Sequence, residues 1–166
     1  LRPQKNSPAG PRARTTKGQT VNLRPALLAD CPTLAAIDAQ GNPSPWTAQQ
    51  FESAVQHHPD SVWLSQADHQ ITGFIVWQTV FDESELHLIA VAPDYRRQGI
   101  ASALLQHWQN AVQQQGVTRL LLEVRASNET AQQLYRKHGF QTCGRRKNYY
   151  TLPDGGSEDA VLMEKS

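Results

Sequence analysis

The chain has 166 residues, with 16 Lys and Arg against 15 Asp and Glu, and 39% of its residues are hydrophobic. A chain of about this length buries roughly 70% of the surface that its unfolded form exposes, so it supports one ordinary hydrophobic core and excludes a second domain. No apolar stretch approaches the ~18 residues of a membrane-spanning helix, so we expect no membrane segment.

The net charge of +1 combines two regions of opposite sign. Residues 1–20 contain five basic residues and no acidic residue, which leaves 11 basic and 15 acidic residues in 21–166. The first region is also rich in Pro and Gly and poor in apolar residues, so we expect 1–20 to be a disordered basic tail and 21–166 to be the folded domain. A solvated extension without function is one interpretation of this tail, and a segment that contacts nucleic acid is the other.

The cysteines and the paired histidines indicate neither a disulfide framework nor a metal site. Cys31 and Cys143 are the two cysteines, which suits a reducing compartment such as the cytoplasm. His57 and His58 are adjacent, so on a helix they face different directions, and no other ligand cluster accompanies them. We expect no metal.

Local signals in the first half of the chain predict two helices and a sheet. Val21–Arg24 reads as a short extended segment, and Asp30 is in position to cap a helix that ends near Gly41. After a proline-rich connector, Thr47 and Gln50 fit a capping box for a second helix, with Trp46 and Phe51 as its hydrophobic staple. Ranges 61–66 and 71–80 predict a hairpin, and 85–91 predicts the next strand.

The second half alternates between helix and strand. We expect a long helix from Ile100 to about Gly116, a strand over 119–124, and a helix capped by Asn128 that stops before Gly139. Ranges 140–143, 148–152 and 160–163 then predict three terminal strands.

The turn between the strand 85–91 and the long helix carries the most informative chemistry. Arg96-Arg97-Gln98-Gly99 brings backbone N–H groups and positive charge to a helix N-terminus, which is an arrangement that favours phosphate. A solvated turn that merely opens an amphipathic helix is the alternative. The glycine spacing fits neither a P-loop nor a dinucleotide-binding fingerprint.

At this turn the sequence resembles the Gcn5-related N-acetyltransferase (GNAT) superfamily, whose acetyl-CoA motif has the form Arg/Gln-x-x-Gly-x-Gly/Ala. Here the motif reads Arg96-Arg97-Gln98-Gly99-Ile100-Ala101 and follows Ile89-Ala90-Val91-Ala92. Further segments are similar to the bacterial RimI-type ribosomal-protein-alanine N-acetyltransferases, and they are Asn42-Pro43-Ser44-Pro45-Trp46-Thr47, Leu122-Glu123-Val124-Arg125-Ala126-Ser127-Asn128, Arg145-Arg146-Lys147-Asn148-Tyr149-Tyr150 and Glu158-Asp159-Ala160. The resemblance covers about 145 residues, which is the whole chain except the tail.

The resemblance implies a fold and a set of site residues. The fold is a mixed α/β arrangement: a mostly antiparallel twisted sheet of about seven strands that contains a parallel, splayed pair, flanked by about four helices. Cofactor contacts are implied for Ile89, Ala90, Val91, Arg97, Gln98, Gly99, Ile100, Ala101, Ser102 and Asn128. Glu123 is implied as general base and Tyr135 as general acid. Ala101 and Leu88 depart from the family pattern, and Leu88 stands where relatives often carry a polar residue.

The residues support these roles on physical grounds, and each has an alternative. Transfer from a thioester to an amine needs a proton acceptor for the amine and a proton donor for the thiolate. Glu123, near the end of a buried strand, is a candidate acceptor, and a structural ion pair with Arg125 or Arg119 is its alternative. Tyr135 lies two helical turns after Asn128 on the same face, and a purely structural core aromatic is its alternative.

Other side chains near this segment are weaker candidates. His87 precedes the expected acetyl site and is either an auxiliary base or an ordinary sheet histidine. Arg145 and Arg146 with Tyr149 and Tyr150 suit either a nucleic-acid patch or the wall of a substrate channel. We favour the channel, with Tyr149, Tyr150 and Trp46 as substrate-binding residues.

The leading hypothesis is an acetyltransferase that moves acetyl from acetyl-CoA to the N-terminal alanine of a small-subunit ribosomal protein by direct attack in a ternary complex. We expect it in the cytoplasm, as a monomer or weak dimer, without a metal, a membrane contact or direct binding of nucleic acid. One rival is an acetyltransferase for lysine or a small-molecule amine. Another is a catalytically silent module that senses acyl-CoA or binds the ribosome.

Overall fold

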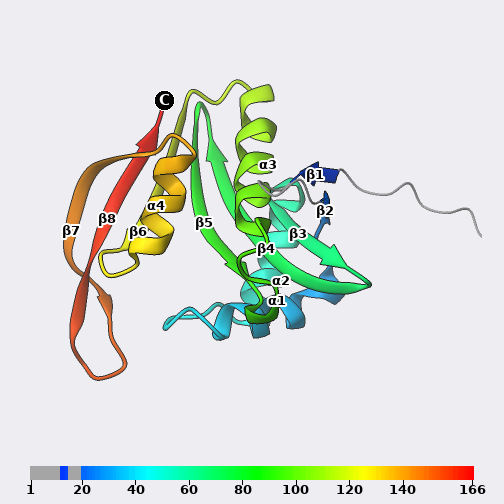
Figure 1. Ribbon diagram of the computed structural model, residues 1–166, viewed down its shortest axis with the longest axis horizontal. Helices are drawn as coiled ribbons and strands as arrows, with labels where there is room; N and C mark the ends of the chain where they lie inside the picture. The colour runs from blue at the N-terminus through cyan, green and yellow to red at the C-terminus, as the bar shows by residue number, and fades with distance from the viewer. Residues whose placement is uncertain (1–11, 15–19) are drawn as a thin grey trace, which may run out of the picture.

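The computed structural model describes residues 12–14 and 20–166 and contains one sheet with helices on both of its faces (Figure 1). The strands are β1 (Arg12–Arg14), β2 (Thr20–Pro25), β3 (Val62–Ala67), β4 (Gln70–Val80), β5 (Glu83–Val91), β6 (Arg119–Arg125), β7 (Gln141–Thr151) and β8 (Ser157–Lys165). The α-helices are α1 (Cys31–Ala39), α2 (Ala48–His57), α3 (Ile100–Gln114) and α4 (Glu129–Lys137). Three 3-10 turns, η1 (Leu28–Asp30), η2 (Pro59–Ser61) and η3 (Pro93–Tyr95), complete the list.

The strand order is β1-β2-β3-β4-β5-β6-β8-β7, and every neighbouring pair is antiparallel except β5 and β6. This confirms the expected mixed α/β fold with one parallel pair and four α-helices. The sheet has eight strands where about seven were expected. The additional strand is β1, which pairs with β2 and falls within 1–20, the range expected to be a disordered tail. Residues 1–11 and 15–19 lie outside the described residues.

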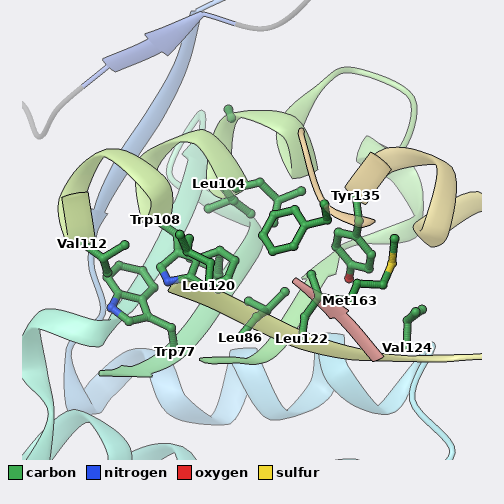
Figure 2. Close-up of a cluster of buried hydrophobic side chains, with 14 of the residues drawn as sticks. Trp77, Leu86, Leu104, Trp108, Val112, Leu120, Leu122, Val124, Tyr135 and Met163 are labelled. Carbon is green, nitrogen blue, oxygen red and sulfur yellow. The ribbon is translucent and has the colours of Figure 1, made fainter. Parts of the chain in front are cut away.

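The sheet separates two hydrophobic cores. Successive residues of β4 point to opposite faces, as they must in a strand, so Phe74 and Val76 belong to one core and Ile75 and Trp77 to the other. The first core contains the buried side chains of α1 and α2. The larger core contains those of α3 and Tyr135 of α4 (Figure 2). Helices α1 and α2 therefore cover one face, and α3 and α4 cover the other.

Two of the predicted helix starts form as expected and one differs. Thr47 and Gln50 make the reciprocal capping box, and the rings of Trp46 and Phe51 lie 5.3 Å apart as a staple. The Asn128 side chain accepts the N–H of Ala131 and caps α4. Asp30 precedes α1 but does not cap it. Its carboxylate instead accepts hydrogen bonds from the Arg24 guanidinium at 2.8 and 2.9 Å and from the Leu27 N–H at 2.8 Å.

The C-terminal strands also differ from the prediction. The ranges 140–143 and 148–152 are not separate strands but parts of β7, which pairs with β8 over most of its length. Two irregularities in register, at Thr142/Gly144 and at Arg146/Tyr150, interrupt the regular alternation, and the sequence pattern consequently reads as two short strands. The β7–β8 hairpin extends away from the rest of the molecule (Figure 1).

The parallel pair β5–β6 holds together at only one end. Cα partners run from Glu83↔Arg119 to Leu86↔Leu122, and beyond them the two strands diverge (Figure 1). Over the diverging part, β5 still pairs with β4 and β6 still pairs with β8, so only the facing edges are open. Within the described part of the chain, no helix combines the length and hydropathy of a membrane span.

Candidate active site

A cavity of about 310 Å³ lies where β5 and β6 diverge. Strand β5 contributes Leu86 to Val91, and β6 contributes Glu123, Val124 and Arg125. The remaining lining residues are Ile37, Asp38, Gly41, Asn42, Arg96, Asn128, Tyr135 and Tyr150. The structure thus brings together, around one cavity, the predicted Ile89, Ala90, Val91, Glu123, Asn128, Tyr135 and Tyr150.

Glu123 lies on β6 immediately after the paired part of the strand, with 19% of its side chain exposed. Its Oε1 is 3.4 Å from Nε of Arg146 on β7. Neither partner considered from the sequence is used, because Arg125 pairs with Glu158 and Arg119 pairs with Glu83 and Glu164. The carboxylate is therefore held at the cavity by two residues of β7, the exposed Arg146 and the Tyr149 phenol, which is hydrogen-bonded to it, and an exposed ion pair contributes little stability.

Tyr135 comes from α4, and its ring packs against Phe140 with centroids 6.2 Å apart. The residue is 6% exposed, and burial together with the neighbouring Tyr150 strongly raises the pKa of its phenol. The phenol therefore keeps its proton throughout the neutral range and is available as a hydrogen-bond donor. Asn128 starts the same helix, and its carboxamide oxygen is engaged as the N-cap.

The N-terminus of α3 follows β5 through the arginine-rich turn. Gly99 has φ = +80°, a conformation in which a residue with a Cβ is strained, and it lets the chain turn directly into the helix. The first bond of the helix is from the Ala103 N–H to the Gly99 carbonyl, so the N–H groups of 99–102 have no intrahelical acceptor. Four donors with the positive end of the helix dipole form an anion-binding geometry.

The rest of this turn sits beside the cavity. Arg96 lines it and donates from Nε to the Val91 carbonyl at 3.4 Å. The predicted cofactor residues Arg97 to Ser102 are not part of the cavity lining. They continue from its β5 wall, since α3 begins at Ile100, nine residues after Val91.

The predicted substrate residues are divided between two hollows. Tyr150 lines the first cavity, where the Arg125 guanidinium lies 4.5 Å from its ring centroid. Tyr149 is 48% exposed and is absent from the lining of that cavity. It nevertheless lies close to a lining residue, because the Glu123 carboxylate, together with burial, raises the pKa of its phenol. Trp46 lines a second hollow of about 360 Å³ between α2 and β4, and His87 lines both hollows.

The sequence interpretation missed Asp38, which lines the first cavity from α1. Asp38 is 3% exposed and accepts the N–H of Trp46 at 2.9 Å and the amide of Asn42 at 3.3 Å. Burial raises the pKa of its carboxyl, although these hydrogen bonds oppose the change. An acidic residue next to Ile37 on the apolar side of a helix was the signal that could have identified it.

Within residues 12–14 and 20–166, no three His, Cys, Asp or Glu side chains are grouped as metal ligands. Cys31 is buried and Cys143 is exposed, and neither forms a disulfide. His57 and His58 line the second hollow.

Comparison with known proteins agrees with this geometry. Residues 28–140 match the model of the acetyltransferase (GNAT) family. The chain is 40% identical over 134 residues to the [ribosomal protein bS18]-alanine N-acetyltransferase of Escherichia coli K12, covering 81% of this chain and 89% of that protein. It is 36% identical over 149 residues to a putative enzyme of the same name from Bacillus subtilis, covering 89% and 95%.

A solved structure is also similar. The crystal structure of the ribosomal-protein-S18-alanine N-acetyltransferase from Escherichia coli superposes with a TM-score of 0.79 at 35% identity, over 87% of this chain and 92% of that one. The fold, the splayed strands and the sequence matches lead to one conclusion: this chain belongs to the acetyltransferase (GNAT) family.

Proposed function

We propose that the chain transfers the acetyl group of acetyl-CoA to the α-amino group of an N-terminal alanine, and that the acceptor is a small-subunit ribosomal protein. The observation that carries this proposal is the cavity between the diverging strands, which is lined by Glu123, Asn128 and Tyr135 together. Similarity to the alanine N-acetyltransferases of Escherichia coli and Bacillus subtilis supports the choice of acceptor.

The cofactor would lie along β5 and the start of α3. The open edge of Ile89 to Val91 offers main-chain groups for the pantetheine arm, since these residues line the cavity and do not pair with β6. The pyrophosphate would bind the N–H groups at the start of α3, with Arg97 to Ser102 around it. Asn128 would contact the cofactor close to its reactive end.

The reaction would be a direct attack of the amine on the thioester. The amine nitrogen forms a bond to the acetyl carbon, the C–S bond breaks, and the amine proton passes to Glu123, directly or through water. The departing thiolate accepts a hydrogen bond, and finally a proton, from Tyr135, and the resulting phenolate regains a proton from solvent. Because burial raises the pKa of Tyr135, stabilisation of the developing thiolate by the hydrogen bond is its main contribution, and full proton transfer comes late.

An α-amino acceptor suits a single carboxylate base. Its ordinary pKa is about 7.7–8.0, so on the order of a tenth is neutral near pH 7, whereas a lysine side chain at about 10.4 is far less available. The base therefore does not need to deprotonate an ammonium group before the attack. Its principal task is to remove the proton from the nitrogen after the attack.

The test is transfer to synthetic peptides, with the acetyl group located by mass spectrometry. Three peptides are compared: one with a free N-terminal alanine and no lysine, the same peptide with a blocked N-terminus, and a blocked peptide with one lysine. We expect acetyl on the first alone. Acetyl only on lysine, or only on small polyamines in a parallel screen, would contradict the proposal. A version lacking residues 1–20 tests our further proposal that 21–166 is the catalytic domain.

A further inference from the structure

One side-chain pair joins the start of α3 to the end of α4. Ser102, the third residue of α3, has its Oγ 2.9 Å from Nε2 of His138, the residue that follows α4. The two residues are 36 positions apart in the chain, and the contact is partly buried. Local sequence pattern therefore does not create the pair; the packing of the two helices does.

The backbone of His138 is fixed from three elements. Its N–H donates to carbonyls of α4, and its carbonyl accepts from Lys165 Nζ of β8 at 2.9 Å and from Gln109 Nε2 of α3 at 3.5 Å. Lys165 also donates to Gln109 Oε1 at 2.6 Å. These bonds fix the position of the His138 backbone relative to α3, which keeps the imidazole within reach of Ser102.

The direction of the proton in this hydrogen bond matters for any anion at the helix start. If the hydroxyl donates to a bare Nε2, its proton is used and the Oγ presents only lone pairs. If Nε2 carries a proton and donates to Oγ, the hydroxyl proton is free to point to a phosphate oxygen. The imidazolium form always has a proton on Nε2 and adds a positive charge.

We propose that His138 is a positioning residue for the cofactor, which donates from Nε2 to Ser102 Oγ so that the Ser102 hydroxyl donates to the pyrophosphate, and that the negative charge of the pyrophosphate favours the imidazolium form, so that cofactor binding takes up a proton. This inference rests on the proposed function, because it needs the pyrophosphate at the start of α3. It adds a residue that is outside the turn motif and belongs to a different helix.

The surroundings of His138 determine whether cofactor binding takes up or releases a proton. In the free protein, burial lowers the pKa of His138, and the positive charges of Lys165 and Lys137 lower it further. No acidic side chain contributes to this shift. The imidazole is therefore mostly neutral at pH 7 without cofactor, and a pyrophosphate anion nearby raises its pKa. The cofactor then binds more tightly at low pH, and this additional affinity is lost as pH rises through the pKa of His138 in the bound form.

The experiment is calorimetric titration of the full chain with coenzyme A in two buffers of different ionisation enthalpy, which gives the number of protons taken up. We expect a fraction of a proton near pH 7 and a several-fold weaker affinity at pH 8 than at pH 6. In His138→Gln, whose amide can donate without ionising, affinity at pH 8 stays near that of the unaltered chain, and the His138-dependent uptake disappears. In His138→Leu, affinity is several-fold weaker at all pH values.

Controls separate this inference from the proposed function. His69→Asn, on the exposed β3–β4 turn, retains the full proton uptake. In a Ser102→Ala background, His138→Leu causes no further loss of affinity if His138 acts through Ser102. Absence of coenzyme A binding in the unaltered chain contradicts the proposed function. Binding with equal proton uptake in the unaltered chain and His138→Gln, or an undiminished effect of His138→Leu in Ser102→Ala, overturns this inference alone.

Discussion

The two halves of the β5–β6 pair perform different tasks with the same strands. In the paired half, up to Leu86↔Leu122, the strands share a ladder, and the side chains of both leucines are buried in the larger core (Figure 2). In the diverging half, the strands face each other across a cavity that is lined by charged residues such as Glu123 and Arg125. The paired half therefore contributes mainly to the core, and the diverging half contributes to the core through Val124 and lines the candidate site as well.

The change takes place between two consecutive residues. Leu122 is 2% exposed in the larger core, whereas Glu123 is directed to the cavity. Because neighbouring side chains of a strand point to opposite faces, consecutive residues of β6 lie in the core and at the candidate active site. The comparison therefore predicts that substitutions at these neighbours separate stability from activity.

The largest effect is expected from Leu122→Ala. Removing a fully buried leucine leaves a cavity between β5 and β8, because Leu86 and Met163 are its cross-strand neighbours. We expect a loss of about 3 kcal/mol in the free energy of unfolding, measured by urea denaturation. A loss below about 1 kcal/mol would mean that the paired half does not carry the core as described.

Glu123→Gln is expected to give the complementary result. If Glu123 is the base, as we propose, its removal lowers kcat for the alanine peptide by about 10²-fold, which corresponds to about 2.7 kcal/mol in the barrier. Stability and coenzyme A affinity stay nearly unchanged, since the arginine of the lost ion pair, Arg146, is exposed and such pairs contribute little. Arg146→Gln is the matched control and keeps most of the rate. If both variants lose the same activity, Glu123 serves the ion pair and not the chemistry.

Asp38→Ala tests the wall that faces the diverging strands. It leaves the Trp46 N–H without its acceptor, and we expect a loss of about 2 kcal/mol in unfolding free energy together with a raised KM for the peptide. Asp60→Asn, on an exposed turn, is the control. Unchanged KM with lowered stability would limit Asp38 to a structural role.

The carboxyl group of Asp38 also makes the free energy of unfolding depend on pH. Its pKa is raised by burial, so the folded state binds more protons than the unfolded state between the two pKa values. Relative to Asp38→Asn, which cannot ionise, the unaltered chain should lose stability as pH rises through this window. Unfolding at a series of pH values above 4 measures it, and the opposite slope would show that the hydrogen bonds outweigh burial.

Local signals in the sequence predicted local structure well. The Thr47–Gln50 capping box and the Asn128 cap form as expected, because each is a contact between residues three apart. Asp30 met the same positional rule, yet it pairs with Arg24, a competing partner whose presence a cap rule does not consider. Strand β7 was divided in two because its irregular register interrupts the pattern.

The site depends on contacts that no local pattern specifies. The fold and the roles of Glu123, Asn128 and Tyr135 were expectations from family resemblance, and the structure places all three at one cavity. The ion-pair partner of Glu123 was not predictable, because Arg146 is on another strand. The arginines nearer in sequence, Arg125 and Arg119, bind other glutamates. Asp38 was missed because its partners lie in the following loop.

Tyr135→Phe should have the smallest effect of these substitutions, and it tests how the thiolate leaves. The ring stays packed on Phe140, so stability changes little, and loss of one hydrogen bond to the developing thiolate lowers kcat by about 10-fold. Tyr95→Phe, whose hydroxyl bonds to Gln70 outside the cavity, is the control. Since burial raises the pKa of Tyr135, its ionisation should cause no decline of kcat below pH 10. A decline near pH 9 that disappears in Tyr135→Phe would show instead that the phenol ionises readily and transfers its proton early.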